Sequence, residues 1–292
     1  MRAVDLFAGA GGASHGLKLA GYDVTGYDHW QPAVDCHNAN GMPAHLHDLS
    51  DPTQDHLIPH APLWWASPPC QPFSAAGAGE GEFDGRDGFP WLLRLVTLRR
   101  PDVLIVENVK GLTFRKHSAY FCGVLEGLRA LGYVLDWRVL MAADLGVPQT
   151  RERCIIVARL DGGPITWPTP THCETGGMFT LPWVTMAQAL GWDDGAMTLH
   201  YRQNDPEGNP ITCNLDGRPA PTIGTQSQSQ WIIEPHGKVT ITELATLQGF
   251  PADWTWTGTK TQQARMVGNA VPPALAHAVA AANRPLQMER AA

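Results

Sequence analysis

Short strand-like segments, most of them apolar, recur through the first half of the chain and end in turn-forming or acidic residues. They cover residues 4–7, 24–28, 45–48, 63–66, 103–109, 133–141 and 154–158. Between them, apolar residues recur at helical spacing at residues 32–40, 91–100 and 120–131. The run 103–106 is apolar without alternation, which is typical of a strand buried on both faces. The sequence therefore predicts an α/β fold with a mostly parallel, doubly wound sheet.

The composition and periodicity of the chain change near residue 160. Residues 160–237 are rich in Pro, Gly, Thr and Trp and show no sustained periodicity. Helical spacing returns at 242–251, with Thr240 or Thr242 as the expected N-cap. Residues 265–273 are expected to open a final alanine-rich helix that ends near residue 282. We predict a first domain over 1–159 and a smaller irregular lobe over 160–237.

Composition limits the class of protein. The 292 residues are 43% hydrophobic and 17% charged, enough for one sizeable core and a smaller lobe. No segment reaches the ~20 apolar residues of a membrane span, and the first residues do not read as a signal peptide, so we expect a soluble, cytoplasmic protein. The six cysteines form no C-x-x-C pair, and neither a metal site nor a disulfide framework is predicted.

Charge is distributed unevenly around a formal net charge of −7. Residues 94–116 carry six cations and two carboxylates, a local charge of +4. Residues 160–237 carry eight carboxylates and two arginines, a local charge of −6. The net charge argues against indiscriminate binding of polyanions, and the segment 160–237 is itself acidic. Phosphate contacts are therefore expected from the positive stretch and from loops of the other lobe.

A glycine turn and two acids point to a cofactor site. The first strand ends in the sequence AGAGG at residues 8–12, a tight turn that lets a ligand approach the backbone at a helix N-terminus. The spacing differs from the G-x-G-x-x-G of dinucleotide-binding proteins, and a turn required only for packing is the alternative. Asp28 and Asp48 end the next two strands, and Asp28 has the place of a ribose-binding carboxylate. A solvated loop acid is the alternative for Asp28 taken alone, and the second acid at a strand end, Asp48, strengthens the cofactor-site interpretation.

Cys70 lies in the segment SPPCQPFS, directly after the apolar run 63–66. The prolines end that strand abruptly and hold the thiol at its carboxyl edge, where open α/β sheets bind ligands. This favours a nucleophile, while a small buried cysteine is the alternative. Five glycines follow within residues 77–88, which predicts a mobile lid beside the thiol.

Three further side chains complete the candidate chemistry. Glu107 emerges from the buried strand, where burial disfavours the charged form of a carboxyl group. Arg151 and Arg153 alternate along an extended segment and are expected on one side of it, an arrangement that suits a base carbonyl or a phosphate. An exposed ion-paired face is the alternative.

Six segments in this order resemble motifs of the cytosine-C5 DNA methyltransferase family, of the bacterial or phage type. They read DLFAGAGG at 5–12, PCQPFS at 69–74, ENV at 107–109, QTRER at 149–153, LQGFP at 247–251 and GNAVP at 268–272. The chain departs from the family pattern at 86–91, where it reads RDGFPW and the family often has R-G-x-L-F.

The resemblance implies a Rossmann-like, S-adenosylmethionine-dependent methyltransferase sheet and a target-recognition domain over 160–237. A return segment over 238–292 would complete the catalytic domain through its C-terminal helix. The implied reaction transfers a methyl group from S-adenosyl-L-methionine to C5 of a flipped cytosine in a short DNA sequence, through a covalent Cys70 adduct. The implied setting is restriction–modification or phage or host self-protection by a monomer that acts on double-stranded DNA beside a partner restriction endonuclease.

The resemblance also implies roles for individual residues. The catalytic residues are Cys70, Glu107, Arg151 and Arg153. The cofactor-binding residues are Phe7, Gly9, Gly11, Gly12, Asp28, His29, Asp48, Pro69, Asn269 and Ala270. The substrate-binding residues are Ser74, Gln149, Thr225 and Gln226. For Thr225 and Gln226, which begin a Thr/Gln/Ser series at 225–230, a polar surface loop is the alternative.

Three rival functions remain. The same chemistry could act on RNA, and activity on duplex DNA against tRNA separates the two. A catalytically idle DNA-binding relative is opposed by the intact Cys70, Glu107, Arg151 and Arg153. A nicotinamide-dependent oxidoreductase would need a better dinucleotide fingerprint than the one at 9–12.

Overall fold

The computed structural model describes residues 1–69, 87–193, 195, 197–205 and 209–286. The chain forms two compact units, and each is described by itself. Unit 1 comprises Met1–Leu140, Glu152–Pro168 and Ala276–Ala292, and unit 2 comprises Met141–Arg151 and Thr169–Leu275. Within the described residues, no helix is long and apolar enough to cross a membrane, and no group of three or more His, Cys, Asp or Glu side chains could hold a metal ion.

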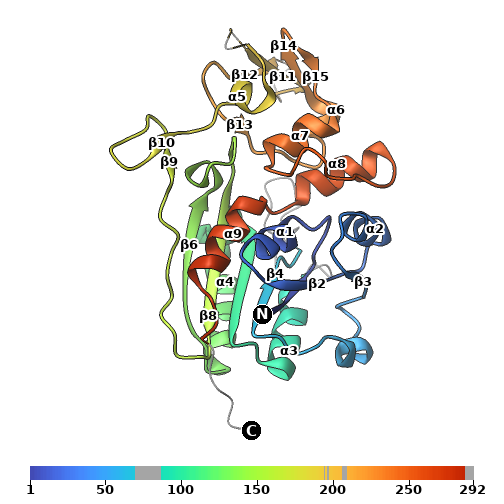
Figure 1. Cartoon of the computed structure of the whole chain (residues 1–292), viewed down its shortest axis with the longest axis vertical. Helices are drawn as coiled ribbons and strands as arrows, with labels where there is room; N and C mark the ends of the chain where they lie inside the picture. The colour runs from blue at the N-terminus through green and yellow to red at the C-terminus, as the bar shows by residue number, and fades with distance from the viewer. Residues whose placement is uncertain (70–86, 194, 196, 206–208, 287–292) are drawn as a thin grey trace. The chain divides into compact units, whose positions relative to one another are not determined.

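Unit 1 is built on a seven-stranded sheet (Figure 1). Its strands are β1 (Arg2–Leu6), β2 (Asp23–Asp28), β3 (Ala44–Leu46), β4 (Leu63–Ala66), β5 (Val103–Val109), β6 (Val134–Met141) and β8 (Glu152–Arg159). Their order is β3-β2-β1-β4-β5-β8-β6; the first five are parallel and β8 runs antiparallel to β5. The prediction of a mostly parallel sheet is confirmed.

Helices cover both faces of this sheet. They are α1 (Gly12–Leu19), α2 (Gln31–Ala39), α3 (Phe89–Arg99), α4 (Ser118–Ala130) and α9 (Pro273–Ala282). Alternate strand residues such as Val4, Trp64 and Leu104 belong to the core cluster that contains the apolar residues of α3 and α4. On the opposite face, Asp5 contacts Ser14 of α1. Because side chains alternate along a strand, this arrangement is doubly wound, as predicted.

The strand order reverses between β1 and β4. The chain proceeds from β1 to β2 and β3 on one side, and continues with β4 and β5 on the other. Ligands of open α/β sheets bind at the carboxyl ends of the strands where this reversal occurs. The segments that leave these two strands are the glycine turn at 7–12 and the proline pair at 68–69.

Unit 2 contains more regular structure than the sequence predicted. Its central sheet has the order β12-β11-β14-β15 and is antiparallel. Its strands are β7 (Gln149–Thr150), β9 (His172–Cys173), β10 (Leu181–Pro182), β11 (Thr198–Asn204), β12 (Pro210–Asn214), β13 (Ala220–Pro221), β14 (Trp231–Glu234) and β15 (Gly237–Lys238). Its helices are α5 (Met186–Leu190), α6 (Ser227–Gln230), α7 (Ile241–Leu247) and α8 (Lys260–Asn269). Thr240 caps α7 in a capping box with Glu243. The single helix that residues 265–273 were expected to open is two helices in the structure, α8 and α9.

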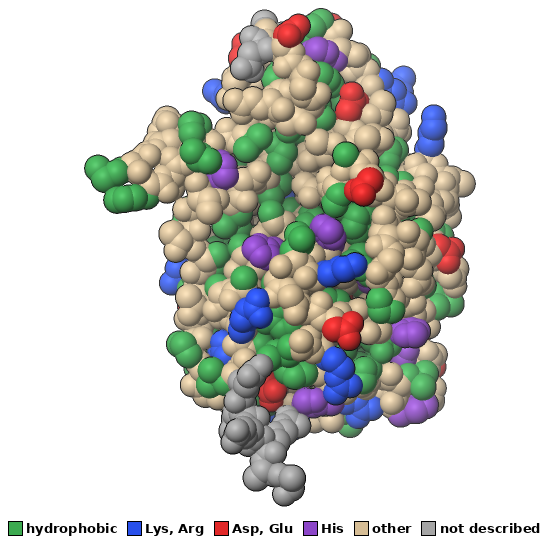
Figure 2. All heavy atoms as spheres, in the orientation of Figure 1, with side chains coloured by type: hydrophobic (Ala, Val, Ile, Leu, Met, Phe, Trp, Pro, Cys, Tyr) green, Lys and Arg blue, Asp and Glu red, His purple; other side chains and the backbone are tan. Residues whose placement is uncertain are grey.

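The loop between β9 and β10 ends in exposed apolar side chains. Met178 and Phe179 are each 89% exposed, and Figure 2 shows hydrophobic side chains gathered at the end of this loop. The loop is hydrogen-bonded at its base, where Thr171 N donates to Asp144 O and Trp183 Nε1 to Asp144 Oδ1.

The boundaries of the two units differ from the predicted domains. We expected residues 238–292 to return to the first domain, but α7 and α8 lie in unit 2 and the chain returns to unit 1 only at Ala276. The physical reason is a buried polar network, described below, that joins α7 and α8 to β7.

Gly268 lets α8 pack directly on the backbone of a neighbouring loop. A Cβ atom at this position would lie 2.4 Å from Gly224 C and from Thr225 N. Gly268→Ala is expected to lower the free energy of unfolding by about 1–3 kcal/mol or more, because backbone atoms cannot move aside as a side chain can. Denaturant unfolding measures the change. Gly123→Ala in α4 is the matched control, since nothing lies within 4 Å of its Cβ position and alanine favours a helix; equal losses in both variants would contradict the prediction.

Candidate active site

The turn after β1 has the backbone of a ligand-binding loop. Phe7, Gly9 and Gly11 all have positive φ, at 59°, 54° and 92°. A Cβ atom on Gly11 would lie 2.7 Å from the His37 ring, so this glycine is needed for packing as well as for conformation. At Gly9 nothing lies within 4 Å of the Cβ position, which leaves open space above the turn. The Phe7 ring stacks on Trp91 at 6.4 Å between centroids.

Asp28, at the end of β2, is joined to this turn. Its carboxylate accepts hydrogen bonds from Gly9 N (2.8 Å) and Trp30 N (2.9 Å). A carboxylate has about four lone-pair sites, so Asp28 can still accept further hydrogen bonds. The structure thus brings two of the predicted cofactor-binding segments together.

His29 and Asp48 lie near the same edge with greater exposure. The His29 side chain is 65% exposed, with its Nδ1 3.6 Å from Asp28 Oδ1. Asp48 lies two residues beyond the end of β3 and accepts hydrogen bonds from Ser50 N and Oγ at 2.9 and 2.6 Å. These bonds hold the pKa of Asp48 below its ordinary value, so its carboxylate is ionised at neutral pH.

Asp5 is a buried acid that the sequence reading did not single out. It lies within β1, fully buried; Ser14 Oγ donates to its Oδ2 at 2.7 Å, and its Oδ1 has no hydrogen-bond partner among the described residues. Burial, with the charges of Asp28 and Glu107 adding, raises the pKa of Asp5 to about 7. A strand pattern read from sequence does not reveal whether an acid has a partner.

This shift predicts a pH dependence of stability. Asp5 retains its proton up to about pH 7 in the folded protein, whereas in the unfolded chain it loses the proton near pH 3.8. The contribution of this proton to the free energy of unfolding is therefore fully present below pH 3.8 and is lost as the pH rises to 7. Asp5→Asn, neutral throughout, is expected to unfold with a larger free energy than the wild type at pH 8 and with a similar one near pH 4. Urea unfolding at several pH values measures this, and parallel curves for the two proteins would contradict it.

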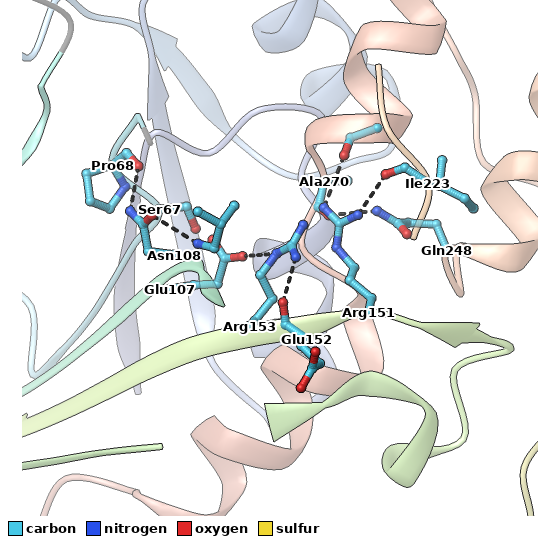
Figure 3. A network of polar contacts seen from close by, with 12 residues as sticks. Ser67, Pro68, Glu107, Asn108, Arg151, Glu152, Arg153, Ile223, Gln248 and Ala270 are labelled. Atoms are coloured by element: carbon cyan, nitrogen blue, oxygen red, sulfur yellow. Dashed lines mark hydrogen bonds and ion pairs between the residues drawn. The ribbon is translucent and has the colours of Figure 1, made fainter. Parts of the chain in front are cut away.

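The carboxyl end of β5 carries an ion pair with β8. Arg153 Nε lies 2.8 Å from Glu107 Oε1, and each side chain is only 10% exposed (Figure 3). The antiparallel register of β5 and β8, with Val109 opposite Arg153, makes the pair possible. The sequence pattern indicated that Glu107 is buried but not that Arg153 lies beside it.

The next residue, Asn108, links this site to the segment that precedes Cys70. Asn108 Nδ2 donates to Pro68 O at 3.1 Å. Cys70 follows Pro68 by two positions, but Cys70, Ser74 and residues 77–86 of the expected lid lie outside the described residues. Pro69 is described and packs at Gly88, where a Cβ atom would lie 2.5 Å from Pro69 Cδ.

Arg151 has a different environment from Arg153, contrary to the expectation of a matched pair. It is buried in unit 2, where its Nη1 donates to Ile223 O (2.9 Å) and its Nη2 to Gly268 O and Ala270 O (3.1 Å each) (Figure 3). The reason is the interruption between β7 and β8 at this residue, which breaks the strict alternation of an extended strand. Arg151 therefore holds main-chain carbonyls.

Gln149 is fully buried in the same network, whereas the sequence predicted a substrate contact. Its Oε1 accepts from Ile223 N at 2.9 Å, and its Nε2 donates to Leu247 O and to Gln248 Oε1. Gln248 in turn donates to Ala270 O at 2.8 Å. Three of the six motifs thus meet in one buried hydrogen-bond network, which leaves Gln149 no free donor or acceptor for DNA in this conformation.

The other residues of unit 2 that were expected to bind cofactor or substrate are either exposed to solvent or take part through a backbone carbonyl. Asn269 is exposed, and Ala270 is buried with its carbonyl in the network. Thr225 and Gln226 are exposed just before α6, and Gln226 Oε1 accepts from Gln230 Nε2 at 2.6 Å.

Comparisons with known proteins agree with this geometry. The family model described as C-5 cytosine-specific DNA methylase matches residues 1–175 and 191–283, which include all six motifs. Type II methyltransferase M.AplI of Arthrospira platensis is 31% identical over 95% of this chain and 84% of its own length. Type II methyltransferase M1.HphI of Haemophilus parahaemolyticus is 31% identical over 96% of this chain and 85% of its own length.

A solved structure supports the fold. The Dnmt2 methyltransferase of S. pombe matches with a TM-score of 0.66 and 19% identity, over 96% of this chain and 97% of its own. With the family model covering most of the chain, the sheet, the glycine turn and the Glu107–Arg153 pair have one common explanation: the chain belongs to the C-5 cytosine-specific DNA methylase family and is a DNA (cytosine-5) methyltransferase.

Proposed function

We propose that this enzyme transfers a methyl group from S-adenosyl-L-methionine to C5 of a flipped cytosine in a short DNA sequence, through a covalent adduct with Cys70. The observation that carries the proposal is the Glu107–Arg153 pair at the carboxyl end of β5. Its neighbour Asn108 is hydrogen-bonded to Pro68, two residues before the proposed nucleophile.

The residues of the turn and of β2 fit the cofactor. The open space above Gly9 admits a ligand to the backbone, and Asp28 is held in place with acceptor capacity left for ribose hydroxyls. Phe7, Gly11 and Gly12 would line the methionine and ribose side, and Asp48 would accept from the adenine amine. We also assign His29, Pro69, Asn269 and Ala270 to cofactor binding, as the family motifs imply. The bound cofactor supplies an electrophilic methyl group.

C5 of cytosine is a weak nucleophile, and a covalent step overcomes this. The Cys70 thiolate adds to C6 while Glu107 provides a proton to N3 and accepts from the exocyclic amine. C5 then has enamine character and attacks the methyl carbon as the bond from that carbon to sulfur breaks. Water takes the C5 proton, the C5–C6 double bond re-forms as the C6–S bond to Cys70 breaks, and N3 returns its proton to Glu107. Arg153, held at Glu107, binds O2 and stabilises developing charge.

Other parts of the chain act indirectly or on DNA. Arg151 is a positioning residue that fixes the main chain at Ile223, Gly268 and Ala270. Base flipping is required because C6 and C5 are inaccessible in a stacked duplex. Thr225 and Gln226, both exposed, are assigned to base readout, since Gln suits adenine and Thr either base.

The relatives named Type II methyltransferases favour a role in restriction–modification or in self-protection of a phage or host. In that role the enzyme would work in the cytoplasm as a monomer, on double-stranded DNA that a partner endonuclease would otherwise cut.

Base-resolution methylation sequencing tests the proposal. The protein is expressed in a host without DNA methylation, beside Cys70→Ala. We expect 5-methylcytosine in one short sequence context with the wild type only. If the protein is folded and binds S-adenosyl-L-methionine but leaves the DNA unmethylated, DNA is rejected as the substrate. Methylation of tRNA instead would establish the RNA alternative.

Cofactor binding provides a separate prediction. Asp28→Ala is expected to weaken S-adenosyl-L-methionine binding by tenfold or more, because a lost hydrogen bond to a charged group costs on the order of 1.5–3 kcal/mol. Calorimetric titration measures the Kd. Asp23→Ala, at the exposed opposite end of β2, is the control and should bind as the wild type does. Unchanged affinity in Asp28→Ala would remove this residue from the cofactor site.

A further inference from the structure

The positive stretch 94–116 was expected to contact DNA phosphates, but most of its cations are used within the protein. Arg94 pairs with Asp55 at 2.8 Å, and Lys110 pairs with Glu152 at 2.8 Å. Arg99 donates to Ile58 O at 2.6 Å and Arg100 to Leu131 O at 2.9 Å. These four side chains stabilise unit 1, so the expectation does not hold for the stretch as a whole.

The two remaining cations are Arg115 and Lys116. Both are exposed, and within the described part of the chain no hydrogen bond or ion pair holds either side chain. With His117 they form the 3₁₀ turn η5 (Arg115–His117). Arg115 and Lys116 are therefore the cations of this stretch that can exchange bound water for an anion without first breaking a contact within the protein.

The turn itself is firmly held. Leu112 before it and His117 within it are buried. Backbone hydrogen bonds run from Phe114 N to Gly111 O and from His117 N to Phe114 O, at 3.1 and 2.8 Å, and Ser118 Oγ donates to Arg115 O at 2.9 Å. Because the backbone of the turn is already ordered, binding an anion would restrict only the two cationic side chains.

The turn also lies close to the proposed catalytic carboxyl group along the chain. One short 3₁₀ helix, η4 (Lys110–Thr113), separates it from the end of β5, and η4 packs against β8, the strand that begins with Glu152 and Arg153. It therefore belongs to the same edge of the unit 1 sheet as the Glu107–Arg153 pair.

We propose that Arg115 and Lys116 bind phosphates of the DNA backbone beside the target cytosine. The inference rests on the proposed function, which makes duplex DNA the substrate. It explains how a chain with a net charge of −7 and a recognition segment of −6 binds a polyanion: the catalytic unit supplies the cations, and the recognition domain is left to read bases. Arg115 can bind a phosphate through two N–H groups, and Lys116 acts as a point charge.

The test compares two double variants with equal change in net charge. Arg115→Gln with Lys116→Gln removes the proposed contacts. Lys18→Gln with Arg129→Gln removes two exposed cations in the last turns of α1 and α4. Those turns lie at the opposite edge of the sheet, because a helix that follows a parallel strand runs back along it.

Fluorescence anisotropy measures the Kd of a mixed-sequence duplex of about 30 base pairs at several salt concentrations. Such a duplex offers more phosphates than the roughly 6–10 that a DNA-binding protein contacts. For Arg115→Gln/Lys116→Gln we expect the slope of log Kd against log salt to fall by about two, and the Kd at low salt to rise roughly tenfold. In methylation assays KM for DNA should rise while kcat stays the same, since neither residue contacts the reacting atoms. The control pair should keep the wild-type slope.

Equal slopes for the two variants, or a wild-type slope in Arg115→Gln/Lys116→Gln, would overturn the inference. So would weaker binding of a structured RNA with unchanged binding of the duplex. Single variants, each expected to lower the slope by about one, guard against misfolding of the double variant. If the wild type binds the duplex but methylates none, the proposed function fails, whereas the salt slopes still decide the phosphate contact.

Discussion

Cys70→Ala is expected to abolish methyl transfer and to leave binding of S-adenosyl-L-methionine unchanged. Without the thiolate there is no addition to C6, and C5 keeps the low nucleophilicity of an aromatic base. Removing the nucleophile from a well-studied hydrolase costs about 10⁶ in kcat, so we expect a loss of at least about 10⁴. Transfer of a radiolabelled methyl group under single-turnover conditions measures the rate, and calorimetry measures cofactor affinity.

Cys122→Ala is the matched control for this experiment. Cys122 is an exposed cysteine of α4 that lies outside all six motifs, and its loss should leave the rate unchanged. A rate in Cys70→Ala within tenfold of the wild type would refute the covalent mechanism. Loss of cofactor binding in the same variant would point instead to a structural role of Cys70.

Glu107→Gln is expected to lower kcat by about 10²–10⁴, the typical contribution of a positioned acid or base. The amide keeps the shape of the side chain but cannot deliver a proton to N3. It also leaves the buried guanidinium of Arg153 without its counter-charge, so the free energy of unfolding should fall by about 1–3 kcal/mol. Steady-state kinetics and denaturant unfolding measure the two effects separately.

A neighbouring ion pair, between Glu152 of β8 and Lys110 of η4, provides the control. Glu152 bonds to Lys110 at 2.8 Å, but these side chains are 38% and 45% exposed. An exposed ion pair contributes only about 0–1 kcal/mol, so Glu152→Gln should change stability little and kcat not at all. If Glu107→Gln behaved in the same way, Glu107 would be neither a proton donor nor a buried partner of Arg153.

Arg151 and Arg153 lie in different environments, so variants near each of them are expected to have different effects. Arg153 neutralises a carboxylate at the end of β5, whereas Arg151 binds three main-chain carbonyls in unit 2. The variant Glu107→Gln therefore perturbs the chemistry of one site, while Gly268→Ala perturbs the packing around the carbonyls that Arg151 holds. Activity and stability should change in different proportions in the two variants.

Local sequence determined the elements and the family. Apolar runs, the glycine turn and Thr240 each carry their own structural signal, because strand burial, positive φ and helix capping depend on a few adjacent residues. The strands, the turn and the cap of α7 follow those signals. The six motifs were likewise sufficient to identify the family, because their spacing and order are written in the chain itself.

Tertiary structure decided which polar side chains remain free to act. Gln149 and Arg151 have the residue types of a substrate-binding motif, yet neighbours distant in sequence take up their hydrogen bonds. Asp5 has no special local pattern, but burial raises its pKa to about 7. Of the six cations in 94–116, only Arg115 and Lys116 are left without partners in the described structure. A sequence specifies donors, acceptors and charges, but only the fold decides which of them are already paired, and an unpaired group is the one that can bind a substrate.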